Sequence, residues 1–178
     1  MIVRRATFEE VPAAMALAHE SFMSAVAPHY SDRGIRTFLD FASPDAMLKR
    51  VQENYVVYVA YREERIVGMA ATRDGSHIAM LFVAPHAQRK GVGRRLLEFA
   101  LSECTAEAVT VNASPNSETA YLRFGFRPSS EEKYVDGIRF IPMMVQRKGL
   151  NKAPAPTSGT VTGRADTPPA PVPPVAHL

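Results

Sequence analysis

Hydrophobic and polar positions at the start of the chain follow one strand-like and two helical patterns. Residues 2–7 form a short apolar and basic run that is typical of a strand. Residues 8–24 place apolar side chains three and four positions apart, as on one face of a helix. These side chains are Val11, Met15, Ala18 and Phe22. A second helical pattern covers about residues 34–53, and Ser43 in the sequence ASPD predicts a new helix start within it.

Residues 54–85 change to the pattern of β-structure. β-branched and aromatic residues dominate this stretch, and the turn sequences REER and RDGS interrupt it. We therefore expect three consecutive antiparallel strands. The strand pattern ends at Pro85, and helical spacing resumes at Gly91 and continues to a boundary near Thr105.

The pattern beyond residue 105 predicts one more strand, a short helix and a hairpin. The sequence AVTVNAS is strand-like, and Ser114 with Pro115 matches the N-cap and first-turn pair of a helix. Gly125 predicts the C-terminal end of that helix. The Asp-Gly pair in KYVDGIRF predicts the turn of the closing hairpin.

Composition divides the chain near residue 149. With 178 residues and 46% hydrophobic positions, the chain suits one domain with a sizeable core, which we assign to residues 1–149. Residues 150–178 are rich in Pro and Ala and contain no aromatic side chain, so we predict a disordered tail. The PVPP sequence in this tail also suits a groove that binds polyproline, and both interpretations stay open.

Charge and cysteine content exclude several classes of protein. The 21 Lys and Arg against 18 Asp and Glu permit an anionic ligand but lack the excess of a dedicated nucleic-acid-binding protein. Cys104 is the only cysteine, which excludes an internal disulfide and a Cys-rich zinc site, and we predict no metal. No signal-peptide pattern or membrane-length apolar stretch is present. We expect a cytoplasmic protein that binds neither nucleic acid nor membrane, and leave a homodimer open.

A glycine-rich basic loop joins strand to helix within residues 82–101, FVAPHAQRKGVGRRLLEFAL. Backbone N–H groups at a helix N-terminus bind anions, and Gly91 and Gly93 place no side chain between that backbone and a ligand. Polar and basic donors surround them: Gln88, Arg89, Lys90, Arg94 and Arg95. The pattern suits a pyrophosphate, although a solvated basic helix face explains the same residues. Leu96 stands at the third glycine position of the dinucleotide fingerprint, which is therefore absent.

Two segments resemble the signatures of the GNAT superfamily of acyl-CoA-dependent N-acyltransferases. QRKGVG, which follows MLFVAP, resembles the Gln/Arg-x-x-Gly-x-Gly/Ala signature, and VNASPNSETAYLRFGF resembles the second signature, in which a Tyr precedes Gly-Phe by four residues. The resemblance covers about residues 1–147. It implies an α/β (α+β) fold with a mixed, mostly antiparallel twisted sheet flanked by helices and splayed at the strand HIAMLFVA. The thioester would pass through this gap, and the acceptor amine would enter from the other face.

The resemblance also implies which residues bind acetyl-CoA as co-substrate. The loop amides would hold its pyrophosphate, and the main chain before the loop would bind its acetyl and pantetheine groups. Two asparagines would lie along the pantetheine arm, although Asn116 also suits a helix start. The set is Leu81, Phe82, Val83, Gln88, Arg89, Lys90, Gly91, Val92, Gly93, Arg94, Asn112 and Asn116. Ser114 departs from the asparagine of many members, which puts an amide contact to CoA at that position in doubt.

The implied chemistry is direct attack of a neutral amine on the acetyl-CoA carbonyl. The N–H of Val83 would polarise this carbonyl, and Tyr121 would protonate the departing thiolate. The alternative for Tyr121 is a ring packed under its helix with the hydroxyl at the surface. His77, His29 and Glu20 are candidate bases, and a chain of water molecules would serve as well.

The acceptor is the least defined part of the prediction. We expect a primary amine of a small molecule or peptide. The expected substrate-binding residues are His29, Tyr30, Phe38 and His77, although core packing explains the aromatic ones equally. Two other functions stay open: a non-catalytic acyl-CoA-binding sensor and a protein that binds a partner through its tail.

Overall fold

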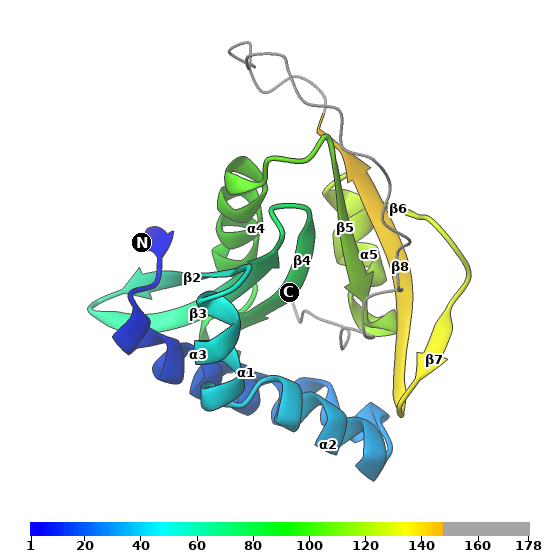
Figure 1. The fold of residues 1–178 in the computed structure, drawn as a ribbon, viewed down its shortest axis with the longest axis horizontal. Coiled ribbons are helices and arrows are strands. Elements are labelled where there is room, and N and C mark those ends of the chain that lie inside the picture. Colours follow the sequence, from blue (N-terminus) through cyan, green and yellow to red (C-terminus); the bar gives the residue numbers. More distant parts are fainter. Residues whose placement is uncertain (148–178) are drawn as a thin grey trace.

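The structure, a computed structural model, describes residues 1–147 and arranges them around one sheet. The strand order is β1-β2-β3-β4-β5-β8-β6, and β7 pairs with β8 (Figure 1). The tail predicted for residues 150–178, with the boundary at residue 149, lies outside the described residues.

The first part of the chain forms a strand and three helices. They are β1 (Ile2–Arg5), α1 (Val11–Ala25), α2 (Asp32–Phe41) and α3 (Pro44–Val51). The predicted break between the last two helices is confirmed, because the Ser43 hydroxyl accepts a hydrogen bond of 3.3 Å from the Ala46 amide and so caps α3. Short 3-10 turns, Phe8–Glu10 and Ala27–His29, flank α1.

The next three strands form the predicted antiparallel meander. They are β2 (Tyr55–Arg62), β3 (Arg65–Arg73) and β4 (His77–Val83). Every residue of β4 is buried, because α1 packs on one face of the sheet and α4 (Val92–Glu103) packs on the other. The rings of Phe22 and Phe38 stack with centroids 3.8 Å apart, and the Phe82 ring of β4 contacts Phe38 edge-on at 5.5 Å. These aromatic contacts fix α1 and α2 against β4.

The sheet then splays between β4 and β5 (Ala108–Ala113). These strands run parallel, but only His77 with Thr110 and Ile78 with Val111 are paired. Beyond Ile78 the two strands diverge, as Figure 1 shows. The splayed, mixed and mostly antiparallel sheet expected from the sequence is therefore confirmed.

The remaining elements complete the side of the sheet beyond the splay. They are α5 (Glu118–Arg123), β6 (Arg127–Pro128), β7 (Lys133–Val135) and β8 (Ile138–Gln146). As predicted, Gly125 follows α5 with a φ of 88°, and Asp136-Gly137 forms the two-residue turn of the β7–β8 hairpin with φ values of 51° and 84°.

The tip of this hairpin is locked to α2 across the open side of the splay. A Cβ atom at Gly34 would lie 2.2 Å from the Gly137 carbonyl oxygen, so only glycine permits this approach. An ion pair of 2.6 Å between Arg33 and Asp136 holds the same contact at the surface. The sequence pattern did not predict this contact between distant segments, which places α2 beside β8.

Candidate active site

The loop before α4 contains two residues in the left-handed conformation and ends at the helix start. Arg89 and Gly91 have φ values of 57° and 80°, and Gly91 is the N-cap of the helix. The amides of the first helical turn have no carbonyl partner within the helix. Arg94 and Arg95 lie in that turn, where their positive charges are close to the positive end of the helix dipole, and Arg94 pairs with Glu98 at 2.8 Å. A bound anion would convert this repulsion into attraction.

A pocket of about 380 Å³ lies beside these amides, and we call it the loop pocket. Its lining joins the end of β4 and the loop to α5. It consists of Val83, Gln88, Arg89, Gly91, Val92, Gly93, Arg94, Ala120, Arg123 and Phe124. Seven of these residues belong to the predicted set, whereas the α5 residues were not predicted and the exposed Lys90 is not part of the lining.

The side of β4 that faces the splay carries backbone groups without a strand partner, and we call it the open edge. The Ala84 amide donates to the Val67 carbonyl at 3.0 Å, and Gly68 lies opposite Val83. Because hydrogen-bonded pairs alternate along antiparallel strands, the peptide groups of Leu81 and Val83 face the splay. Those of Phe82 face β3 instead, so the register turns the main chain of this predicted binding residue away from the open edge.

Tyr121 lies on α5 and is completely buried. Its ring meets the Phe126 ring edge-on at 5.3 Å, and its hydroxyl has no hydrogen-bond partner among residues 1–147. The alternative that placed this hydroxyl at the surface is therefore wrong. Burial raises the pKa of the Tyr121 phenol above its ordinary value, so the group stays protonated at neutral pH. A buried donor without a partner costs about 1–3 kcal/mol, which is the kind of cost found at functional sites.

A smaller pocket of about 100 Å³ lies where the 3-10 turn after α1 meets β8, and we call it the hairpin pocket. It is lined by Val26, His29, Tyr30, Ser114, Pro115, Asn116 and Arg139. The Tyr30 hydroxyl donates to the Arg139 carbonyl at 3.0 Å, and burial raises the pKa of Tyr30. His29 and Tyr30, both predicted to bind the substrate, thus line this pocket. Asn116, predicted for the pantetheine arm, lies here.

Comparisons with known proteins identify the family that has this splayed sheet. The sequence matches the family model described as "Acetyltransferase (GNAT) domain" over residues 26–147. The chain belongs to the GNAT acetyltransferase family. Membership establishes acetyl transfer as its general activity, as the sequence resemblance predicted.

Several solved structures have a similar fold. A GCN5-related N-acetyltransferase from Rhodopseudomonas palustris is 21% identical over 82% of this chain and 94% of its own, with a TM-score of 0.68. The PaiA N-acetyltransferase from Thermoplasma acidophilum, solved in complex with coenzyme A, is 16% identical over 82% and 98%, with a TM-score of 0.67. YjaB from Escherichia coli is 27% identical over 84% and 99%, with a TM-score of 0.57. No curated protein matches the chain.

Three other residues predicted for the substrate site or as a base, His77, Phe38 and Glu20, do not line the hairpin pocket. His77 starts β4 and is not among the residues that line the hairpin pocket with His29 and Tyr30. Its Nδ1 lies 2.8 Å from the Thr110 hydroxyl, and burial, followed by the charge of Arg73, lowers its pKa to about 4. Phe38 belongs to the aromatic core, and Glu20 is exposed on α1.

Two of the polar residues in the second GNAT signature, Asn112 and Ser114, lie in different surroundings. Asn112 lies on β5 opposite Pro142 of β8. Ser114 precedes a 3-10 turn, Pro115–Ser117, rather than α5 itself. Its side chain makes no N-cap hydrogen bond, because its hydroxyl lies 2.8 Å from that of Ser117. Ser114 therefore holds the predicted N-cap position with Pro115 in the first turn, but it precedes the 3-10 turn and its side chain makes no cap bond.

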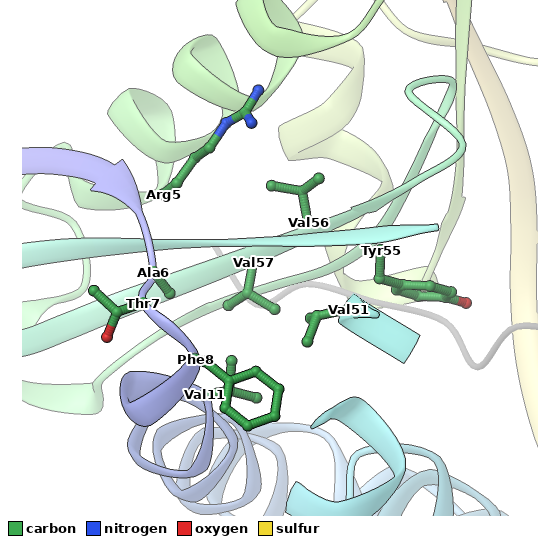
Figure 2. A pocket seen from close by; sticks show the side chains of 9 residues that line it. All are labelled: Arg5, Ala6, Thr7, Phe8, Val11, Val51, Tyr55, Val56 and Val57. Atoms are coloured by element: carbon green, nitrogen blue, oxygen red, sulfur yellow. The ribbon is translucent and has the colours of Figure 1, made fainter. Parts of the chain in front are cut away.

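A third pocket, of about 250 Å³, lies under β2 and away from the loop (Figure 2). The side chains of Phe8, Val11 and Val57 point into it, whereas Arg5 extends toward α4 and pairs with Glu103 at 2.6 Å. Its inward side chains are apolar, so we do not include it in the active site.

The part of the chain that the structure describes contains no cluster of three His, Cys, Asp or Glu side chains able to hold a metal ion. None of its helices has the length and apolar character needed to cross a bilayer.

Proposed function

We propose that this GNAT acetyltransferase moves the acetyl group of acetyl-CoA to a primary amine of a small molecule or peptide. The observation that carries the proposal is the meeting of the loop pocket with the open edge at Val83. Val83 lines the loop pocket, and its peptide N–H faces the splay. A pyrophosphate at the loop amides would therefore direct the acetyl end of the same molecule along β4.

The loop pocket suits the donor in size and charge. Its volume of about 380 Å³ falls within the roughly 300–1,000 Å³ of small-molecule sites. Arg89, Arg94 and Arg123 line it, and no acidic side chain does. Backbone amides and cations together favour a phosphorylated donor over a neutral thioester.

The proposed reaction is a direct transfer. The amine lone pair attacks the thioester carbonyl carbon, and the Val83 N–H stabilises the oxygen as it becomes negative. The new C–N bond forms, the C–S bond breaks, and the Tyr121 hydroxyl gives its proton to the sulfur. The nitrogen loses one proton to a base. Of the candidate bases, only His29 lines the hairpin pocket, and we propose it for this role beside water.

The proposal is tested by measuring thiol release from acetyl-CoA with a panel of amines. The panel contains amino acids, polyamines and peptides with a free N-terminus. We expect release above the background hydrolysis rate with at least one primary amine, together with the acetylated product by mass spectrometry. Binding of acetyl-CoA without release for any amine would support the sensor function instead.

A further inference from the structure

The carbonyl of Val83 takes both of its hydrogen bonds from side chains. The hydroxyl of Ser21 donates to this oxygen at 3.0 Å, and the side-chain amide of Gln88 donates to it at 3.2 Å. Two donors satisfy the two lone pairs of a carbonyl oxygen. At the open edge, Val83 therefore keeps only its N–H for a ligand.

Ser21 is a polar residue at a core position. It lies on α1 among Leu17, Ala18 and Phe22, and like them it is buried, with no exposed surface of its own. A hydroxyl at such a position requires a hydrogen-bond partner, and its donor bond runs to a strand residue 62 positions away. In a fully paired sheet the Val83 carbonyl would accept a hydrogen bond from an amide of the next strand. The splay removes that amide, and the Ser21 hydroxyl replaces it as a donor.

We propose that Ser21 is a positioning residue for acetyl transfer, an inference that rests on the proposed function. The N–H and C=O of a strand residue lie on the same side of the strand, so fixing the Val83 carbonyl also fixes the direction of its N–H. An oxyanion donor acts only within a narrow range of distance and direction. The hydrogen bond from Ser21 on α1 keeps the Val83 peptide group in this orientation, and Gln88 links the same carbonyl oxygen to the proposed pyrophosphate loop.

The test compares Ser21→Ala with Ser24→Ala. Ser24 is a matched control, because it lies one turn along α1 and its hydroxyl donates at 3.0 Å to the Ser21 carbonyl without reaching Val83. We expect Ser21→Ala to lower kcat about three- to tenfold, as for a donor that is misplaced rather than removed. The Kd of acetyl-CoA changes less than about twofold, and Ser24→Ala keeps the wild-type kcat.

A second readout does not depend on turnover. In the unliganded protein, Ser21→Ala shifts the carbonyl ¹³C and amide ¹⁵N resonances of Val83, whereas Ser24→Ala leaves them in place. A lowered melting temperature with wild-type kcat and unshifted Val83 resonances would give Ser21 a purely structural role and overturn the inference. Absence of thiol release by the wild type would overturn the proposed function itself.

Two further variants cover the case in which Ser21→Ala does not fold. Ser21→Thr keeps the hydroxyl donor, and Ser21→Cys replaces it with a weak one. We expect kcat within about twofold of wild type for Thr and a clear loss for Cys. Equal kcat values for the two variants would also overturn the inference.

Discussion

The two ends of β4 are equally buried but differ in what satisfies their polar groups. At the closed end, His77 and Ile78 pair with β5, and the His77 ring contacts the Thr110 hydroxyl. At the open end, the peptide groups of Leu81 and Val83 face the splay. The Val83 carbonyl accepts hydrogen bonds from the side chains of Ser21 and Gln88. At the closed end β5 supplies backbone partners, although the buried Nε2 of His77 has no hydrogen-bond partner among residues 1–147, whereas the open end leaves peptide donors without a strand partner. We therefore expect changes at the closed end to affect stability, and changes around the open end to affect acetyl transfer.

The largest expected effect is a loss of folding stability at acid pH, caused by His77 at the closed end. The folded-state pKa of His77, about 4, lies below the reference value of 6.5, so the unfolded state binds more protons between these values. Stability is therefore lost as the pH falls from about 6.5 to 4, by up to about 3 kcal/mol. Urea unfolding across this range measures the loss. We expect His77→Gln to reduce the dependence of stability on pH and to keep the wild-type kcat at pH 7.5. A lowered kcat at this pH would contradict the division between a stabilising closed end and a catalytic open end.

Tyr121→Phe, on the helix that lines the loop pocket, is expected to affect turnover rather than stability. The substitution removes the buried hydroxyl but keeps the ring against Phe126. We expect kcat to fall at least about tenfold, because a general acid contributes about 10²- to 10⁴-fold and a CoA thiolate leaves readily. The Kd of acetyl-CoA changes less than about threefold, and the melting temperature does not fall. Full activity would assign the proton donation to water or to another residue.

Substitutions in and beside the loop before α4 test whether its backbone conformation determines the affinity for acetyl-CoA. Gly91 has a φ of 80°, and a Cβ atom added to it would meet no protein atom within 4 Å. Gly91→Val is expected to weaken acetyl-CoA binding about tenfold, since the left-handed conformation costs a branched residue about 1–2 kcal/mol and the side chain would cover the amides. Gly91→Asn, which tolerates this conformation, separates strain from obstruction. Arg95→Ala is the charge control, with a loss of about two- to fivefold, and titration calorimetry compares the three. A larger loss for Arg95→Ala would indicate a merely basic surface.

The smallest effect is expected from removal of residues 150–178. The sequence of this segment offers no aromatic side chain to a core, so truncation after Gly149 leaves the melting temperature and the acetyl-CoA affinity unchanged within error. Differential scanning fluorimetry with and without acetyl-CoA is sufficient. A decrease of several degrees would place the domain boundary further along the chain.

The sequence predicted those elements whose signals are local. The meander follows from β-branched runs between two turns, and the break at Ser43 follows from a cap that needs only its own helix. The glycine-rich loop before α4 was predicted because glycines and a helix start are adjacent in the chain. The splay came from the family resemblance, since no periodicity shows where two parallel strands part.

Features that depend on distant segments were missed or misassigned. Ser21 appeared as one polar residue on an apolar helix face, and Arg139 reaches the hairpin pocket only through the register of β8. β6 has two residues, too few for an alternating pattern. Ser114 does take the predicted N-cap position, but it precedes a 3-10 turn and its hydroxyl lies beside that of Ser117 instead of making a cap bond. Contacts between distant segments decided the first two cases, whereas local geometry decided the last two.

The central claim is that the loop holds the pyrophosphate of a donor whose acetyl group lies along the open edge of β4. The most direct test compares the melting temperature with acetyl-CoA and with acetyl-pantetheine, which carries the same thioester without the pyrophosphate. Saturating acetyl-CoA at about 100 times its Kd should add about 2.7 kcal/mol, or roughly 5–10 °C for a domain of this size. Acetyl-pantetheine at the same concentration should give almost no shift. Equal shifts for the two ligands would contradict the claim.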